Sequence, residues 1–115
     1  MANIEPPPFA IEVQQQGSRT RLTLSGELDL ATVGQLEDAI ASRLGAGEDV
    51  VVDLRGLAFM DSSGVRALVA GHATAQNGGG SLTIVRPARD SEVDRVIEVS
   101  GIGPALGMVD EPPPA

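Results

Sequence analysis

"DVVVDL", residues 49–54, is the stretch of the chain that decides the fold class. It is a continuous run rich in β-branched valine, and strands that are buried on both faces of a sheet have this composition. The stretch "FMDSSGVRALVAG", residues 59–71, follows with small polar residues and then with helical spacing of Val65, Leu68 and Val69. A buried strand followed by a helix is typical of an α/β domain, in which strands joined through helices are parallel.

Two stretches of alternating apolar and polar residues precede this strand. They are "FAIEVQQQ" at residues 9–16 and "RLTLSGELD" at residues 21–29, and "GS" at residues 17–18 separates them. Such alternation indicates half-buried strands, and a short break that contains glycine indicates a turn between them. The N-terminal part of the chain is therefore expected to form a β-hairpin, whose two strands are antiparallel.

A first helix is expected to begin at Thr32, before the buried strand. Gln35 lies three residues after Thr32, which is the spacing of a capping box. The "GAG" at residues 45–47 is expected to end this helix. The apolar stripe that predicts its packed face consists of Val33, Leu36, Ile40 and Leu44.

The C-terminal half continues the alternation of helices and strands. The second helix is expected to end at "NGGG", residues 77–80, and "SLTIV", residues 81–85, predicts a strand. Residues 88–101 predict a third helix with Gly101 as its C-cap, while "ALGMV", residues 105–109, is compatible with a short strand and with a short helix. The inward positions of the third helix are expected to be Val93, Val96 and Ile97.

The predicted order is β-β-α-β-α-β-α, which describes a single α/β domain. Its sheet is expected to be mixed, with the N-terminal hairpin plus parallel strands, and with the helices packed against it. The domain is expected to span residues 9–110, between a flexible proline-rich N-terminal tail, residues 1–8, and a proline-rich C-terminal tail, residues 111–115. Consecutive prolines in "EPPP" and "EPPPA" block both helices and central strands.

The composition limits the possible functions. The chain has 115 residues, the length of one domain, and the absence of cysteine excludes disulfides, thiolate zinc sites and thiol catalysis. The formal charge is −8 and arginine supplies every positive charge of the side chains, so direct binding to nucleic acid is not expected. No apolar run approaches the roughly 20 residues that span a bilayer, so a cytoplasmic protein without membrane contact is expected.

Serine catalysis is excluded by spacing. His72 is the only histidine and lies ten residues after Ser62 on the same expected helix, which is roughly 15 Å along the helix axis. A nucleophilic serine needs a base within hydrogen-bond distance. Met60 also occupies the position at which the motif G-x-S-x-G would have its first glycine. No catalytic residue is therefore expected, and His72 is expected to be exposed or half-buried.

Two further kinds of site need to be considered, a phosphate loop formed by the glycine clusters and a phospho-aspartate site formed by acids near strand ends. The glycine clusters follow helices, whereas a phosphate loop precedes one. Asp29, Asp53 and Asp61 are expected at strand ends, along the carboxyl edge of the sheet where sites usually form. Asp53 has the position of the phosphorylated aspartate of a response-regulator receiver, but the chain lacks the receivers' acidic pair and their lysine. Asp53 is therefore expected to bond nearby backbone amides, and no metal or cofactor site is expected.

The sequence "DSSG", residues 61–64, contains more small polar residues than a helix cap requires. At least one of Asp61, Ser62 and Ser63 is expected to cap the following helix, and Gly64 permits a tight entry. The helix amides and macrodipole favour an anion at this position by about 0.3–1 kcal/mol. A serine in this stretch is therefore a candidate for phosphorylation that leaves the domain folded.

Three stretches together resemble bacterial anti-sigma factor antagonists of the STAS domain class. They are "LSGELDLATVGQLEDAI", "VVVDLRGLAFMDSSGVRALVAG" and "GGGSLTIVRPARDSEVDRVIEVSGI", and the resemblance covers about residues 9–110 in consistent order. The combination of "GELD" with "FMDSSG" carries most of the specificity.

The resemblance implies a partner-switching protein rather than an enzyme. The unphosphorylated antagonist would bind an anti-sigma factor that is also a serine kinase, and the sigma factor would then be released for transcription. The kinase would phosphorylate Ser62, with Ser63 as the weaker alternative, and a serine phosphatase would reverse the reaction. Asp29 matches a residue of the family's kinase-docking surface, and Asp61 would order the loop. The surface that would contact the kinase consists of Asp29, Asp61, Ser62, Ser63, Gly64, Arg66 and Ala70.

A second hypothesis keeps the domain class and discards the switch. The chain would then be a STAS scaffold or sensor module whose serine is never phosphorylated. Both hypotheses predict a protein that is itself without enzymatic activity and without cofactors.

Overall fold

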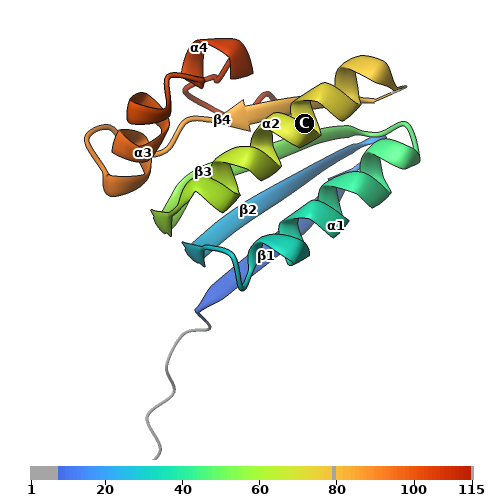
Figure 1. Cartoon of the computed structure of the whole chain (residues 1–115). Coiled ribbons are helices and arrows are strands. Elements are labelled where there is room, and N and C mark those ends of the chain that lie inside the picture. The colour runs from blue at the N-terminus through green and yellow to red at the C-terminus, as the bar shows by residue number, and fades with distance from the viewer. Residues whose placement is uncertain (1–7, 79, 115) are drawn as a thin grey trace, which may run out of the picture.

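A computed structural model describes residues 8–78 and 80–114, and it confirms the α/β fold with a mixed sheet. The sheet has four strands in the order β1-β2-β3-β4 (Figure 1). β1 pairs with β2 antiparallel, and the β2–β3 and β3–β4 pairs are parallel. The elements are β1 (Phe9–Gln16), β2 (Arg19–Leu28), α1 (Val33–Gly45), β3 (Asp49–Met60), α2 (Ser62–Asn77), β4 (Ser81–Val85), α3 (Glu92–Ser100) and α4 (Gly103–Leu106).

The core lies between the sheet and the helices. α1 and α2 lie side by side over one face of the sheet, and α3 and α4 follow β4 at one end of the molecule (Figure 1). The four positions of the α1 stripe are all buried, as the sequence predicted. The sheet contributes residues that are fully or almost fully buried, namely Leu22, Leu24, Val50, Val52, Leu54 and Ile84.

The opposite face of the sheet carries mostly polar and charged side chains. Side chains alternate between the two faces of a strand, so the residues between the buried ones point to this face. Thr20 and Leu22 are buried toward the helices, so Arg19 and Arg21 point to the other side. We call this side the polar face and define it by Arg19, Arg21, Thr23, Asp49, Val51, Asp53, Arg55, Thr83 and Val85.

β3 is longer than the sequence predicted. It continues from Leu54 to Met60, because its second half pairs with the end of β2. Gly56 lies opposite Ser25, and β2 and β3 have two register shifts in this part. Asp53 therefore lies inside β3, and the expectation that it ends the strand is wrong.

The helix ends follow the sequence with local differences. Thr32 precedes α1, but its side chain makes no cap hydrogen bond, so the capping box with Gln35 does not form. The Thr32 hydroxyl donates instead to the carbonyl oxygen of Glu27 at 3.0 Å. Gly101 ends α3 with φ of 74°, a left-handed conformation that glycine adopts without strain, as predicted. Val69 of α2 is 42% exposed, because the helix turns it away from the sheet.

The stretch "ALGMV" contains both of the predicted alternatives. α4 ends at Leu106, and Val109 then forms a parallel bridge with Val85. The N–H of Val109 donates to the carbonyl oxygen of Ile84 at 2.9 Å, and the N–H of Arg86 donates to the carbonyl oxygen of Val109 at 2.8 Å. We call residues 109–114 the C-terminal strap. Residues 1–7 of the expected N-terminal tail lie outside the described residues.

Among the helices that the structure describes, none combines the length and the apolar character needed to cross a membrane.

Candidate functional site

Asp29 and Asp61 occupy one corner of the molecule, where two parallel strands end together. Leu28 pairs with Met60, and the N–H of Asp61 donates to the carbonyl oxygen of Leu28 at 3.2 Å. The two aspartates are the next residues along their chains, at the start of the β2–α1 loop and of α2. The structure thus brings Asp29 and Asp61 together, while Asp53 lies on the polar face, away from this corner.

Asp61 alone supplies the side-chain cap of α2. Its Oδ1 accepts a hydrogen bond from the N–H of Ser63 at 2.8 Å, and its backbone is extended. Its carbonyl oxygen also accepts from the N–H of Gly64 at 3.1 Å. Neither serine hydroxyl provides the cap, so one of them is available for another role.

The two serines differ in exposure. Ser62 is exposed at the first position of α2, whereas Ser63 is 8% exposed and belongs to the buried face of the helix. An enzyme that modifies a folded substrate needs access to the hydroxyl oxygen. In the folded protein Ser62 is therefore accessible to such an enzyme, whereas Ser63 is not.

Gly64 brings the first turn of α2 close to the sheet. A Cβ atom at Gly64 would lie 2.5 Å from Cγ of Met60 and 2.9 Å from Cδ2 of Leu28, which is closer than real contacts allow. Any larger residue would push the helix start away from the ends of β2 and β3. Gly64 therefore sets the position of Ser62 through packing, and its own surface is buried.

Asp29 organises the loop between β2 and α1. Its Oδ1 accepts from the N–H of Ala31 at 3.0 Å and from the N–H of Thr32 at 3.1 Å. The same loop carries Leu30, which is 76% exposed. The carboxylate of Asp29 thus fixes the loop on which the apolar side chain of Leu30 is exposed.

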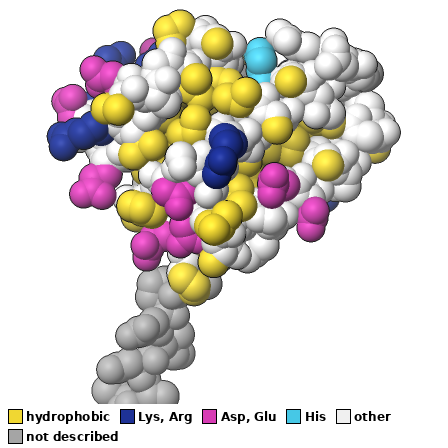
Figure 2. Space-filling model, viewed as in Figure 1, with side chains coloured by type: hydrophobic (Ala, Val, Ile, Leu, Met, Phe, Trp, Pro, Cys, Tyr) yellow, Lys and Arg dark blue, Asp and Glu magenta, His cyan; other side chains and the backbone are white. Residues whose placement is uncertain are grey.

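An apolar groove runs between α2 and α3 and includes Ser62. Its volume is about 540 Å³, and it is lined by Ser62, Val65, Glu92, Arg95, Val96, Val99 and Ser100. Val99 is 81% exposed and forms part of the apolar lining of this groove. Figure 2 shows apolar side chains spread over the helical side of the molecule, with charged groups among and around them.

The other residues expected on the kinase surface fall on the outer side of α2. Arg66 and Ala70 are both exposed there. The sequence interpretation missed Val99 and Leu30. A helical wheel could have found Val99, since the inward positions Val93 and Ile97 leave Val99 on the opposite side of α3.

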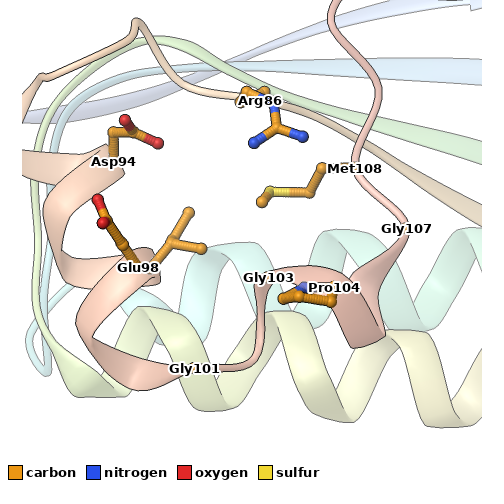
Figure 3. Close-up of a pocket in the computed structure, with 9 residues that line it drawn as sticks. Arg86, Asp94, Glu98, Gly101, Gly103, Pro104, Gly107 and Met108 are labelled. Atoms are coloured by element: carbon orange, nitrogen blue, oxygen red, sulfur yellow. The ribbon is translucent and has the colours of Figure 1, made fainter.

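A second hollow lies between α3, α4 and the end of β4. Figure 3 shows Arg86 and Met108 on one side of it and Asp94 and Glu98 on the other. Its volume is about 600 Å³, and none of its nine lining residues carries a hydroxyl or an imidazole. It does not adjoin Ser62, because the two hollows lie on different sides of α3, so it is not part of the candidate site.

Asp53 forms a structural ion pair. Burial raises its pKa, but hydrogen bonds and charge from Arg55, with a further contribution from Arg21, outweigh this and hold the pKa below its ordinary value. The carboxylate accepts from the Arg55 N–H at 3.0 Å, from Nε at 3.1 Å and from Nη2 at 2.9 Å. The expectation that Asp53 bonds a nearby backbone amide is therefore confirmed.

His72 is half-buried on α2, as expected. Within the described ranges, no three histidine or acidic side chains are grouped so that they could hold a metal ion.

The chain is similar to known proteins over most of its length. The family model described as "Mlab, STAS domain" matches residues 11–109. No curated protein sequence matches the chain. An anti-sigma factor antagonist from Mycobacterium paratuberculosis is 22% identical, with a TM-score of 0.78 over 94% of this chain and 92% of its own, which shows the fold alone.

Two structures of SpoIIAA also match. The anti-sigma factor antagonist SpoIIAA in its unphosphorylated form is 26% identical, with a TM-score of 0.74 over 90% of this chain and 89% of its own. The Bacillus cell fate determinant SpoIIAA in the phosphorylated form is 25% identical, with a TM-score of 0.68 over 90% of this chain and 92% of its own.

Proposed function

The chain belongs to the STAS domain family and has the fold of anti-sigma factor antagonists, and from this premise we propose that it is such an antagonist. In its unphosphorylated form it binds an anti-sigma factor that is also a serine kinase, and the sigma factor is released for transcription. Phosphorylation of Ser62 ends this binding, and a serine phosphatase restores it. The protein works in the cytoplasm as a substrate of these two enzymes and catalyses no reaction itself.

The observation that carries the proposal is the exposure of Ser62 next to the buried Ser63. Asp61 meets the capping requirement of α2, and Gly64 holds the helix start against Met60. Ser62 is thus held in a defined position and is exposed, and its hydroxyl makes no hydrogen bond among the described residues. SpoIIAA, a relative of similar length, exists in an unphosphorylated and a phosphorylated form.

The proposed docking surface surrounds this serine. It consists of Asp29, Asp61, Ser62, Ser63, Gly64, Arg66 and Ala70, and the groove residues Val96 and Val99 and the loop residue Leu30 extend it. Val65, Val96 and Val99 line one groove with Ser62, and contiguous apolar surface of this kind marks sites of protein association. Gly64 and Ser63 contribute by shaping the backbone, because their side-chain positions are buried.

Electrostatics explains how phosphorylation would end the binding. A phosphate adds about −1.5 to −2 charges at neutral pH. Ser62 has acidic neighbours, Asp61 and Glu92, and a basic one, Arg95, which lines the same groove. The phosphate would therefore change the charge of a surface that the kinase had matched in the unphosphorylated form. A misplaced charge in a desolvated interface costs several kcal/mol, and about 4 kcal/mol is a thousandfold in affinity. The switch would therefore act at the interface and leave the fold unchanged.

The direct test is phosphate mapping with the candidate kinase. The purified chain is incubated with ATP and the serine kinase encoded nearest to it, and phosphopeptides are mapped by mass spectrometry. We expect phosphate on Ser62 in the wild type and in Ser63→Ala, and none in Ser62→Ala. Complex formation without any phosphate would favour the alternative of a phosphorylation-independent scaffold or sensor. Phosphate on Ser63 alone would refute the assignment of Ser62.

A further inference from the structure

The C-terminal strap, residues 109–114, crosses the polar face of the sheet. At its start Val109 pairs with Val85, the last residue of β4. At its end the carbonyl oxygen of Pro114 accepts a hydrogen bond from Nη1 of Arg19, the first residue of β2. Because β3 lies between β2 and β4, the strap passes over the polar side of β3. A short extended segment is thus seated on a sheet face that lies opposite the proposed kinase surface.

The strap meets arginine side chains along its whole course. Oδ1 of Asp110 pairs with Nε of Arg86 at 3.2 Å. The pKa of Arg55 is raised mainly by Asp53 and additionally by the charge of Glu111. A hollow of about 370 Å³ opens beside these pairs, and its lining includes Arg55, Arg86 and Arg89. Arg89 makes no ion pair within the described residues.

The hollow beneath the strap carries positive charge, whereas the chain as a whole is negative. The chain has a formal charge of −8 and only eight cationic side chains, yet three of them line one hollow beneath an acidic segment. Guanidinium groups bind carboxylates with directed hydrogen bonds, so the acidic strap is the complementary ligand of this face.

The strap also has a proline-rich sequence, which is typical of segments that bind in an extended conformation. After Asp110 and Glu111 come three prolines, which favour the extended polyproline conformation and lose little entropy on binding. Pro113 and Pro114 line a shallow hollow with Arg19 and Asp49. The tetrapeptide "EPPP" occurs twice in the chain, at residues 5–8 and 111–114.

We propose that the polar face, together with Arg86 and Arg89 at its β4 end, is a peptide-binding surface, and that its ligand is an extended acidic, proline-rich segment of another polypeptide. The strap occupies the same surface as an intramolecular competitor. The exposed ion pair of Asp110 with Arg86 is of a kind that holds weakly, so exchange of the strap for an outside segment is feasible. This proposal is independent of phosphorylation at Ser62, since it concerns the other face of the sheet.

Competition by the strap has a measurable size. If the strap covers the surface for about 90% of the time, the apparent affinity for an outside peptide falls about tenfold. Removing the two strap carboxylates should restore that affinity. The comparison therefore separates a surface that is occupied in cis from a surface that binds no peptide.

The experiment measures binding of a synthetic peptide with the sequence of residues 108–114 to the full-length chain. Two proteins are compared, one with the wild-type strap and one with Asp110→Asn and Glu111→Gln. Both carry Glu5→Gln, so that the N-terminal "EPPP" does not compete. We expect the variant to bind the peptide at least about tenfold more tightly than the protein with the intact strap. A peptide in which asparagine and glutamine replace its two acids should bind neither protein.

Arginine variants identify the surface. In the background without strap carboxylates, Arg86→Gln should weaken peptide binding at least about fivefold, whereas Arg43→Gln on α1 should leave it unchanged. Circular dichroism establishes that each variant is folded, and 0.5 M salt should weaken binding in every variant that binds. Equal affinity of the acidic and the amidated peptide, equal affinity of the two proteins, or no effect of Arg86→Gln would each overturn the proposal.

Discussion

The N–H of Asp61 donates a hydrogen bond to the carbonyl oxygen of Leu28 at 3.2 Å, and this bond joins the ends of β2 and β3 to the start of α2. Asp61 then accepts from the N–H of Ser63 at 2.8 Å. Ser62, which lies between the two bonded residues, therefore has a defined position while its own hydroxyl remains free of both bonds. Several consequences of this corner can be measured.

Loss of the Asp61 carboxylate should destabilise the protein through α2. We expect Asp61→Ala to lower the free energy of unfolding by about 0.5–2 kcal/mol, because the N–H of Ser63 loses its acceptor. Asp61→Asn, which retains an acceptor oxygen, should lose only a small part of this. Urea denaturation measures both values. Equal losses in the two variants would mean that the charge of Asp61, rather than the cap, stabilises the helix.

Gly64→Ala should be destabilising although alanine favours helices. Its Cβ would approach Cγ of Met60 to 2.5 Å, and overpacking of this kind typically costs about 1–3 kcal/mol. Gly34→Ala is the matched control, because nothing lies within 4 Å of a Cβ at Gly34 in α1. That substitution should stabilise the protein by about 0.4–1 kcal/mol. If both variants have the same stability, the close approach at Gly64 does not constrain α2.

The two serines should respond differently to an introduced charge. Ser62→Asp should be as stable as the wild type, because Ser62 is exposed. It should bind the kinase more weakly, whereas Ser62→Ala should bind the kinase as the wild type does. Ser63→Asp should instead lower the free energy of unfolding by about 1–3 kcal/mol, since it forces a carboxylate into a site that is 8% exposed. Thermal unfolding and a binding assay with the kinase measure these effects. Equal kinase affinity of Ser62→Ala and Ser62→Asp would contradict the interface mechanism.

Val99 provides a test of the groove that does not involve phosphate. Val99→Glu should weaken kinase binding at least about tenfold, which corresponds to about 1.4 kcal/mol, and should leave stability unchanged, because the side chain is 81% exposed. Val13→Glu on β1 is the control, since Val13 is also exposed and lies on the edge strand away from the groove. If Val99→Glu binds the kinase with wild-type affinity, the groove is not part of the docking surface.

The Asp53–Arg55 pair should make stability depend on pH at the acidic end. The folded pKa of Asp53 is lowered, so its contribution is fully present above the unfolded pKa of about 3.9 and is lost as the pH falls through the folded value. Asp53→Asn should lower the free energy of unfolding by about 1–3 kcal/mol at pH 7, because Arg55 loses its charged acceptor. The difference between wild type and variant should shrink below pH 4. Asp110→Asn, whose carboxylate is mostly exposed, should show no comparable pH dependence.

Much of the fold could be predicted from local patterns. Spacing alone indicates both the secondary structure and the buried face of several elements. Examples are the valine run of β3, the alternation of β1 and β2, and the apolar stripe of α1. These signals are local, because a side chain's direction depends on the period of its own element. The motif "DSSG" was likewise readable as a helix start with a surplus hydroxyl.

Contacts between distant parts of the chain escaped this reasoning. The valine run predicts a strand over residues 49–54, but the end of β2 supplies pairing partners that extend β3 to Met60. Leu68 and Val69 both have helical spacing from Val65, yet only the position of α2 on the sheet decides which of the two is covered. The strap was likewise readable only as a proline-rich tail.

The sequence by itself determined the domain class, the element order and the pair of serines that follow Asp61, because these depend on residue types at short spacing. Only the tertiary structure decided that Ser62 is exposed and Ser63 buried, that Val99 borders the groove beside Ser62, and that Arg86 pairs with Asp110 of the strap. The reason is that exposure and ion pairing depend on which surfaces meet, and the surfaces that meet here come from elements far apart in the chain.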